Sequence, residues 1–256
     1  MKLLAEMKRI NNDPDLKSYG SPRMTEELND LGFNVSQNTV AGLMRKHGIR
    51  AKRKWGYKPP KTTSADPQAK YNKNLIKENT PSTFGEQLVA DITYIPTKEG
   101  WLYLSVVMDL YTRIIVGWET SVAMPATLVK TSLEHSLRNW SIPPQSATFH
   151  SDRGSQYSSH LIRKWLKVRG IKQSMSAQGI CYDNAHCESF FASLKAECLP
   201  DCGFFSSRAE ARKRLFGYIE GFYNTRRKHS SLGYLSPLIF HQGVWLEEFR
   251  LDGIFG

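Results

Sequence analysis

The sequence predicts an α/β protein in which helices flank a mixed β-sheet, preceded by a small all-α helix-turn-helix domain. From residue 87 onward, runs of β-branched and aromatic residues alternate with helical patterns, which is typical of a sheet covered by helices. Residues 1–55 carry short helical patterns instead. The chain has 256 residues, 40% hydrophobic and 23% charged, and this composition argues against a disordered or fibrous protein.

Two short helices are expected in the first 50 residues. The first begins at Ser21-Pro22, where a capping hydroxyl precedes a proline at the first helical position, and it ends at Gly32. Ser36 caps the second helix, which ends at Gly48. Their apolar residues keep helical spacing: Met24, Leu28 and Leu31 in the first, and Val40, Leu43 and Met44 in the second. The pair indicates a helix-turn-helix, although many small helical domains share this pattern without binding DNA.

Positive charge is concentrated near the N-terminus. The whole chain has 35 Lys and Arg against 24 Asp and Glu, a net charge of +11, and residues 1–80 hold 16 and 8 of these, a net of +8. The run from Arg45 to Lys61 contains eight basic residues and no acidic one. Such a run favours contact with phosphates, and a solvated basic linker is the alternative. The candidate DNA-binding residues of this region are Arg45, Lys46, Lys52, Arg53 and Lys54.

We expect four parts along the chain. Residues 1–55 form the helix-turn-helix domain, 56–80 a basic and polar linker, 81–245 the α/β unit with its C-terminal helices, and 246–256 a tail. The linker is expected to contain one short helix, from Pro67 to Lys77. No apolar run approaches the roughly 18–20 residues that span a bilayer, and the N-terminus does not resemble a signal peptide, so a cytoplasmic protein without a membrane partner is predicted.

The α/β unit begins with three strands that we expect to be antiparallel, followed by alternating helices and strands. The strands are expected at Gln87–Pro96, Trp101–Met108, Arg113–Glu119, Ala147–Ser151 and Ile171–Met175. Helices are expected at Pro125–Trp140 and Ser158–Arg169.

Two further helices follow. The first is capped by Asp183 or Asn184, and on its flank Glu188 and Lys195 lie within roughly 20° of each other. Its apolar face consists of Cys187, Phe190, Phe191, Leu194 and Cys198. The last helix opens with a capping box formed by Ser207 and Glu210, and it ends in a second basic cluster that includes Arg227. It is expected to bury Leu215, Tyr218, Ile219 and Phe222.

Four cysteines cluster in the C-terminal third, with His186 among them. They are Cys181, Cys187, Cys198 and Cys202. A zinc site is one interpretation. Buried free thiols are favoured, because two of the four belong to the apolar helix face.

Three carboxylates stand where an unpaired negative charge is unexpected. Asp91 interrupts an apolar strand, Asp152 ends a short strand before a glycine-containing turn, and Glu188 lies beside an apolar helix face. Three such oxygen ligands suit two Mg²⁺ or Mn²⁺ ions that assist phosphoryl transfer. The alternative is a salt bridge for Asp91, a turn for Asp152 and a surface position for Glu188. Asp109 also ends an apolar strand, and a turn or an ion pair with Arg113 is preferred for it.

Five long motifs occur in order along the chain: ADITYI at 90–95, VVMDLYTR at 106–113, HSDRGSQY at 150–157, CYDNAHCESFFASLK at 181–195 and YNTRRKHSSLGYLSP at 223–237. By these motifs the chain resembles the DDE transposases of bacterial insertion sequences, relatives of retroviral integrases. Its group is the one whose enzyme often comes from the second of two overlapping reading frames. The 35 residues between Asp152 and Glu188 match the spacing typical of that group. Residues 19–51 look like the helix-turn-helix segment that precedes the core.

The resemblance implies a ribonuclease-H-like fold with Asp91, Asp152 and Glu188 as metal-binding catalytic residues, and Lys195 as a contact to the transposon end. It implies a transposase that cleaves the 3′ ends of an element and joins them to target DNA with two Mg²⁺ or Mn²⁺ ions. The implied partners are the terminal inverted repeats, target DNA, further copies of the chain and a helix-turn-helix protein from an upstream frame. The implied location is the nucleoid. A nuclease of the same fold without strand transfer, and a non-catalytic DNA-binding regulator, are the alternatives.

Overall fold

The computed structural model describes residues 2–52, 71–77, 79–176 and 185–243. Several sequence predictions therefore lie outside the described residues. They concern Arg53, Lys54, Cys181, both candidate caps at 183 and 184, and the tail at 246–256.

A five-stranded mixed sheet, in the order β3-β2-β1-β4-β5, forms the centre of the α/β unit. Strands β1 (Gln87–Thr97), β2 (Gly100–Asp109) and β3 (Ile115–Ser121) are antiparallel neighbours, as predicted. Strands β4 (Thr148–Ser151) and β5 (Lys172–Met175) extend the sheet in parallel with β1. The third strand starts two residues later than predicted, because Arg113 adopts a left-handed conformation (φ 65°) that belongs to the turn.

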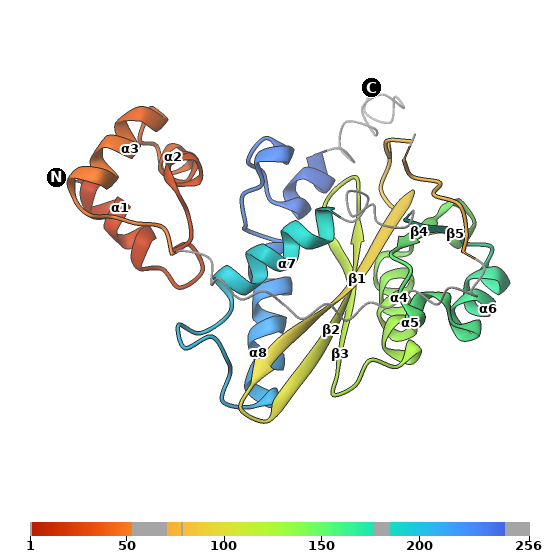
Figure 1. Ribbon diagram of the computed structural model, residues 1–256. Coiled ribbons are helices and arrows are strands. Elements are labelled where there is room, and N and C mark those ends of the chain that lie inside the picture. Colours follow the sequence, from red (N-terminus) through yellow and green to blue (C-terminus); the bar gives the residue numbers. More distant parts are fainter. Residues whose placement is uncertain (1, 53–70, 78, 177–184, 244–256) are drawn as a thin grey trace, which may run out of the picture.

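Helices cover both faces of the sheet. Helices α4 (Ala126–Trp140), α5 (Ser155–Ser158) and α6 (His160–Arg169) lie on one side of it, and α7 (Ala185–Glu197) and α8 (Arg208–Tyr218) lie on the other (Figure 1). The helix predicted at 158–169 is α6 and begins two residues later than predicted, because Ser159 is extended and its hydroxyl caps α6 by accepting a hydrogen bond from the Ile162 N–H. The short helix α5 that precedes it was not predicted. The described residues also form 3₁₀ turns at Pro144–Ser146 and Ser230–Leu232.

Helix α8 continues into a π-helical turn at Ile219–Tyr223. At its start, the Ser207 hydroxyl accepts from the Glu210 N–H as predicted, but the Glu210 carboxylate accepts from Ser206 rather than from Ser207. Half of the predicted capping box is therefore formed. The four apolar residues expected on this helix are buried. Asn224, just beyond the π-turn, accepts from the Ile115 N–H at 2.9 Å and donates to its carbonyl at 3.1 Å, which fixes the chain against β3.

Three helices precede the linker: α1 (Lys2–Asn12), α2 (Ser21–Asp30) and α3 (Gln37–Lys46). The first of them was not predicted. Ser36 caps α3 through the Thr39 N–H as expected, whereas Ser21 is the first residue of α2 and makes no capping bond there. Leu31 was assigned to the apolar stripe but is 49% exposed at the C-cap. The described part of the predicted linker helix, residues 71–77, is not helical.

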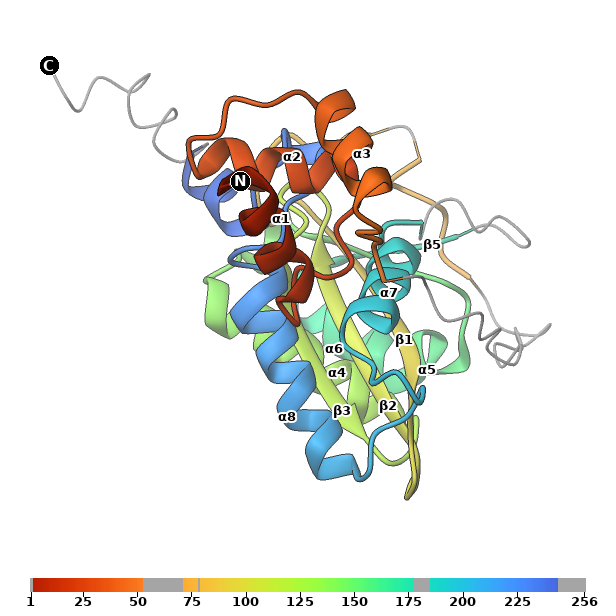
Figure 2. The same ribbon diagram turned by 90° about the vertical axis from the view of Figure 1, so that its left-hand side faces the viewer.

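The N-terminal helices lie against the C-terminal end of α7 and the segment that follows α8 (Figure 2). Their buried apolar residues belong to one hydrophobic cluster with residues of β1, β2, α7 and α8. The Tyr19 hydroxyl accepts from the Lys228 N–H at 3.0 Å, and the Lys228 ammonium pairs with Asp30. Lys52 donates to the Leu199 carbonyl at 2.9 Å. The helical domain is thus seated on the α/β unit by apolar and polar contacts together.

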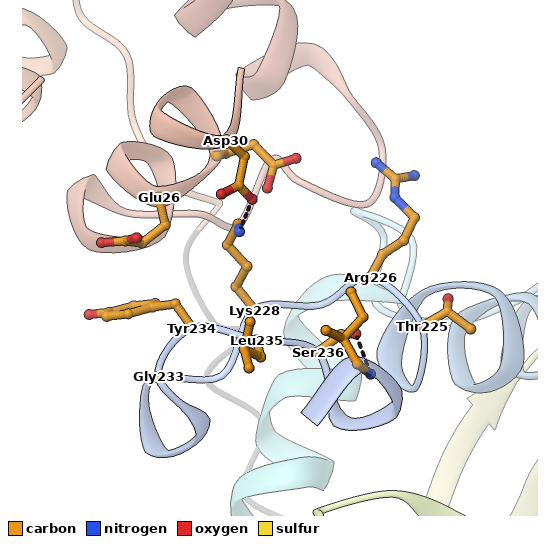
Figure 3. A pocket seen from close by; sticks show the side chains of 11 residues that line it. Glu26, Asp30, Thr225, Arg226, Lys228, Gly233, Tyr234, Leu235 and Ser236 are labelled. Carbon is orange, nitrogen blue, oxygen red and sulfur yellow. Dashed lines mark hydrogen bonds and ion pairs between the residues drawn. The ribbon is translucent and has the colours of Figure 1, made fainter. Parts of the chain in front are cut away.

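A cavity of about 260 Å³ lies at this junction, between α2 and residues 225–239 (Figure 3). Glu26, Glu27 and Asp30 line one side of it, and Arg226 and Lys228 line the other. None of the three predicted catalytic carboxylates lines it, so it belongs to the interface between the two domains. No helix among the described residues is long and apolar enough to cross a membrane.

Candidate active site

The first two candidate carboxylates are brought together by the parallel pairing of β1 with β4. Val89 lies opposite His150 in this register, so Asp91 and Asp152 occupy matching places two residues further along the two chains. Neighbouring strands lie about 4.8 Å apart. Asp91 is still inside β1 and paired with Val106 of β2, whereas Asp152 comes directly after the end of β4. The two acids are therefore neighbours at the point where β4 stops.

The third carboxylate comes from α7, which lies over β1. The Cys187 thiol lies 3.8 Å from the Val89 carbonyl, and this contact fixes the start of the helix above the strand. Glu188, the next residue, is exposed on the same turn. The predicted apolar face of this helix is buried throughout.

Asp152 and Glu188 both influence the electrostatics of Asp91. Burial first, then the Asp152 carboxylate and more weakly the Glu188 carboxylate, raise the pKa of Asp91 to about 8. The Ile92 N–H, which donates to Asp91 at 2.8 Å, and the Lys195 ammonium oppose this shift. Burial, and more weakly the Asp91 and Glu188 carboxylates, raise the pKa of the Cys187 thiol. Asp91 is thus at the centre of a cluster of negative charge.

Asp152 is held by the turn that follows β4. Its Oδ1 accepts from the Gly154 N–H at 2.9 Å, the local bond by which an aspartate stabilises a turn. A Cβ atom at position 154 would lie 3.0 Å from the same oxygen, so glycine leaves room for this carboxylate. The turn role suggested for Asp152 is therefore present together with its proximity to Asp91.

Lys195 lies two turns after Glu188 on α7 and is half-buried. Burial lowers the pKa of its ammonium, and the Asp91 carboxylate partly offsets this effect. The predicted neighbourhood of Glu188 and Lys195 on the helix therefore places Lys195 beside the carboxylate cluster.

The carboxylates suit a divalent metal by their chemistry and charge. All are hard oxygen donors, and burial together with the neighbouring carboxylates raises the pKa of Asp91. Within the described ranges, no three His, Cys, Asp or Glu side chains lie close enough together to hold one metal ion. The carboxylates thus have the chemistry that Mg²⁺ or Mn²⁺ prefers, but their side chains are neighbours and do not form a complete set of ligands around one point.

The predicted DNA-binding residues have different environments. Arg45 and Lys46 are exposed at the end of α3. Lys52 pairs with Asp201 at 2.9 Å. Arg227 is corrected to a structural residue, because it is 3% exposed and its guanidinium pairs with Glu197 at 2.7 Å. A buried, paired guanidinium cannot contact DNA phosphates.

Asp109 and the cysteines have structural environments. Asp109 accepts from the Thr112 N–H and hydroxyl at 2.7 Å and from the Gly85 N–H at 2.9 Å, so of its two predicted roles it has that of a turn residue. Cys187 and Cys198 are buried free thiols, as favoured, and Cys202 is an exposed free thiol.

Sequence reasoning missed Tyr157, which closes the HSDRGSQY motif. Its side chain is 2% exposed, and both Asp91 and Asp152 raise the pKa of its hydroxyl. The signal was its fixed place five residues after Asp152, but a tyrosine in a helical turn carries no charge pattern that singles it out.

Comparison with known proteins identifies the family. Two models of the family described as integrase core domain match residues 82–181 and 169–237, and a model of the HTH-like domain matches residues 2–55. The transposase InsF for insertion sequence IS3A of Escherichia coli (strain K12) is 42% identical over 221 residues, which cover 86% of this chain and 75% of that protein. This chain belongs to the IS3-family transposases.

Other relatives of this transposase are consistent with that assignment. The insertion element IS600 uncharacterized 31 kDa protein of Shigella sonnei is 38% identical over 227 residues, 88% of this chain and 82% of that protein. Among solved structures, the simian T-cell lymphotropic virus intasome in complex with PP2A regulatory subunit B56 gamma has a TM-score of 0.53 at 13% identity, and covers 87% of the transposase and 70% of the matched chain. This likeness concerns the fold, and it confirms the ribonuclease-H-like sheet with its preceding helical region.

Proposed function

We propose that this transposase cleaves the 3′ ends of an insertion element and joins them to target DNA, with Asp91, Asp152 and Glu188 as its catalytic residues. The observation that carries the proposal is the register of β1 against β4, which places Asp91 and Asp152 at matching positions, together with the pKa of Asp91, which burial and the Asp152 and Glu188 carboxylates raise. A desolvated carboxylate beside other carboxylates is stabilised in its charged form by a bound cation. This arrangement therefore supports a site for divalent cations.

The three carboxylates would hold two Mg²⁺ or Mn²⁺ ions. When bound, such ions activate the attacking oxygen and stabilise the leaving oxygen of an in-line displacement at phosphorus. Lys195 would orient the phosphate of the element end, a role supported by the influence of the Asp91 carboxylate on the pKa of its ammonium. The α7 helix would place Glu188 and Lys195 together over β1, so that metal and DNA contacts come from one rigid element.

The reaction would proceed in two displacements that balance without a further reactant. A water oxygen first forms a bond to phosphorus at the element end, and the bond to the 3′-oxygen breaks and leaves a 3′-hydroxyl. That hydroxyl then loses its proton and attacks a target phosphate, and a 3′-oxygen of the target leaves. One phosphodiester bond is made for each one broken in the second step, so no external energy source is required.

The test is strand cleavage and joining on a labelled terminal repeat with Mg²⁺. We expect Asp152→Asn to abolish both products. Asp201→Asn makes the same change at an exposed carboxylate, and we expect it to cut as the unaltered protein does. Cleavage by the Asp152→Asn protein at the unaltered rate would refute the assignment.

The same assay separates the two alternatives. A nuclease of this fold gives cut ends and no joined product, whereas a non-catalytic regulator binds the repeat and leaves it intact. Joined product that depends on Asp152 excludes both.

We further propose that the helix-turn-helix domain grips the terminal inverted repeats through the exposed end of α3. Arg45 and Lys46 support this, because both are exposed and no described acidic residue forms a salt bridge with either of them.

We propose that the chain is divided into a DNA-binding domain, a linker, a catalytic core and a tail, at residues 1–55, 56–80, 81–245 and 246–256 respectively. The resemblance supports action as a homo-oligomer at the nucleoid in the cytoplasm, with a helix-turn-helix partner from an upstream frame. Light scattering with and without a terminal-repeat duplex measures the oligomer.

A further inference from the structure

Residues 71–77 of the predicted linker, which we call the edge segment, lie along β5 at one edge of the sheet (Figure 1). The Leu75 N–H donates to the Ser174 hydroxyl at 2.8 Å. The Asn72 side-chain amide donates to the Gln173 side chain at 3.0 Å. An edge strand presents unpaired backbone groups, and a segment that covers it protects them. The linker is therefore fastened to the α/β unit beside the end of β4.

The first residue of the edge segment, Tyr71, contacts the turn that carries Asp152. The Arg153 guanidinium lies over the Tyr71 ring, 4.7 Å from the ring centre, which is within the range of a cation–π interaction. The same guanidinium donates from Nε to the Ser176 carbonyl at 2.8 Å. Arg153 directly follows Asp152 in the chain. Its side chain is therefore held between the linker on one side and the residue after β5 on the other.

The backbone before Asp152 is fixed by the sheet instead. The His150 ring is fully buried, and its Nε2 lies 3.1 Å from the Ser176 hydroxyl. The Ser151 carbonyl accepts from the Ser176 N–H at 3.1 Å. The chain that enters the turn is thus bonded to the neighbouring strand, whereas the chain that leaves it is held through Arg153.

A second bridge joins the edge segment to the residues after Asp152. The Gln173 side chain accepts from Asn72 and donates from Nε2 to the Tyr157 carbonyl at 3.0 Å, at the end of the turn and its short helix α5. Backbone contacts alone would cover the strand edge. A planar guanidinium that both stacks on a ring and donates to a carbonyl also has a fixed orientation, which covering the edge does not require.

We propose that Tyr71 is a positioning residue, whose ring holds the Arg153 guanidinium so that Arg153 fixes the Asp152 carboxylate toward bound divalent ions. The inference rests on the proposed function, because it assumes that Asp152 is a metal ligand. The linker then supports the candidate active site, in addition to connecting the helical domain with the α/β unit.

The test measures the Mn²⁺ affinity of full-chain variants by electron paramagnetic resonance, and Tm in EDTA as a measure of folding. Tyr71→Leu removes the aromatic face, and Tyr71→Phe keeps it. Tyr111→Leu is the matched control, because Tyr111 is also partly buried and its ring packs against Phe240, with ring centres 5.7 Å apart. Tyr71→Leu is also made in an Arg153→Gln background, where the comparison cancels the effect of the lost positive charge and isolates the coupling of the pair.

We expect Tyr71→Leu to weaken Mn²⁺ binding by about two- to fivefold, the range that corresponds to one cation–π contact. Tyr71→Phe and Tyr111→Leu should bind Mn²⁺ as the unaltered protein does. In the Arg153→Gln background, Tyr71→Leu should cause no further loss. Arg153→Lys keeps the charge without the planar guanidinium, and it should weaken Mn²⁺ binding at least as much as Tyr71→Leu.

Unchanged Mn²⁺ affinity in Tyr71→Leu would overturn the inference, even with a lower Tm in EDTA, because the ring would then support the fold alone. An equal loss in Tyr71→Phe, or an equal loss in the Arg153→Gln background, would overturn it as well, because the effect would not depend on the aromatic face or on the guanidinium. Asp152→Asn separates the two levels: if it too binds Mn²⁺ as the unaltered protein does, the proposed function fails rather than the role of Tyr71 alone.

Discussion

Asp91 lies in the middle of a strand that is otherwise apolar, and its surroundings determine its chemistry. Its pKa of about 8 follows from burial and from two further carboxylates, and only one ammonium, that of Lys195, opposes them. A strongly shifted carboxylate is typical of functional sites, and it supports the metal-binding role proposed for Asp91.

The role proposed for Lys195 predicts that its replacement affects the binding of DNA but not the binding of metal. We expect Lys195→Ala to weaken binding of a terminal-repeat duplex and to reduce by about one the slope of log affinity against log salt, because one phosphate contact is lost. Mn²⁺ binding should persist. Fluorescence anisotropy across a salt series measures both quantities.

Lys213→Ala is the control for this change, because Lys213 is exposed on α8, away from the carboxylates. An unchanged slope in Lys195→Ala would remove Lys195 from the DNA contacts.

His229 makes the fold sensitive to acid. Burial, with the nearby charges of Arg227, Arg23 and Arg113, lowers the pKa of His229 to about 3. Below its ordinary pKa of about 6.5 the unfolded chain therefore takes up a proton that the folded chain does not, and stability falls as the pH decreases from 6.5 toward 3.

We expect the unaltered protein to lose about 2–3 kcal/mol more than His229→Gln between pH 7.5 and pH 4.5, measured by urea unfolding. His47→Gln is the matched control, because His47 is exposed at the end of α3 and should not alter the pH dependence. Parallel stability curves for the unaltered protein and His229→Gln would contradict the assignment.

At the scale of elements, one buried ion pair joins α7 to the segment after α8. Glu197 at the end of α7 accepts from Arg227 at 2.7 Å and 2.8 Å and from the Tyr218 hydroxyl at 2.6 Å. Arg227 also donates to Ser193 at 3.0 Å. These bonds hold the helix that carries Glu188 and Lys195, so its orientation over β1 depends on residues that follow α8.

We expect Arg227→Met to destabilise the protein by about 3–5 kcal/mol, because it leaves the Glu197 carboxylate buried without its guanidinium. Arg226→Met, at the exposed neighbouring position, should change stability by less than about 0.5 kcal/mol. Chemical unfolding of the two variants measures this difference. Equal effects would mean that the pair contributes no more than a surface charge.

The elements that sequence predicted are those with a strong local pattern. The apolar run of β1 and the apolar face of α7 follow directly from the local sequence. Asp152 and Glu188 were named from their places beside such patterns. Helix α1 was missed because only Met7 and Ile10 are buried in it, too few to form a period. Arg227 was misassigned because its partner Glu197 lies 30 residues away, and a basic cluster by itself favours DNA.

The sequence predicted the residues of the candidate site but not their arrangement, because the arrangement depends on contacts between distant parts of the chain. Residue chemistry and motif order name the carboxylates, but their meeting depends on the register of β4 against β1, which is a non-local pairing. The stacking of Arg153 on Tyr71 is likewise a property of packing, because it joins the linker to the turn after β4. No local pattern reveals whether an arginine has found an aromatic partner.

At the scale of the whole molecule, the helical domain and the α/β unit share one hydrophobic cluster. Tyr19 is fully buried at this junction, where its hydroxyl accepts from the Lys228 N–H. Arg23 on α2 lies 3.9 Å from Glu197. Through these contacts, the helix-turn-helix domain and helix α7, which carries Glu188, belong to one packed structure.

We therefore expect a single calorimetric unfolding transition for the unaltered protein. Tyr19→Ala removes the ring from the shared cluster and should cost about 3–5 kcal/mol, enough to separate the transitions of the two parts. Tyr19→Phe keeps the ring and loses one hydrogen bond, so it should cost about 1 kcal/mol and keep one transition. Two transitions in the unaltered protein would show that the parts unfold independently.

The bond between Tyr19 and Lys228 joins residues 209 positions apart. During synthesis the chain emerges from the ribosome N-terminus first, so helices α1–α3 are complete long before the segment on which they rest exists. The surface against which they pack, at Lys228, is completed only after Asp91, Asp152 and Glu188 have all been translated. A polypeptide released early would carry the basic helices without the segment against which they pack.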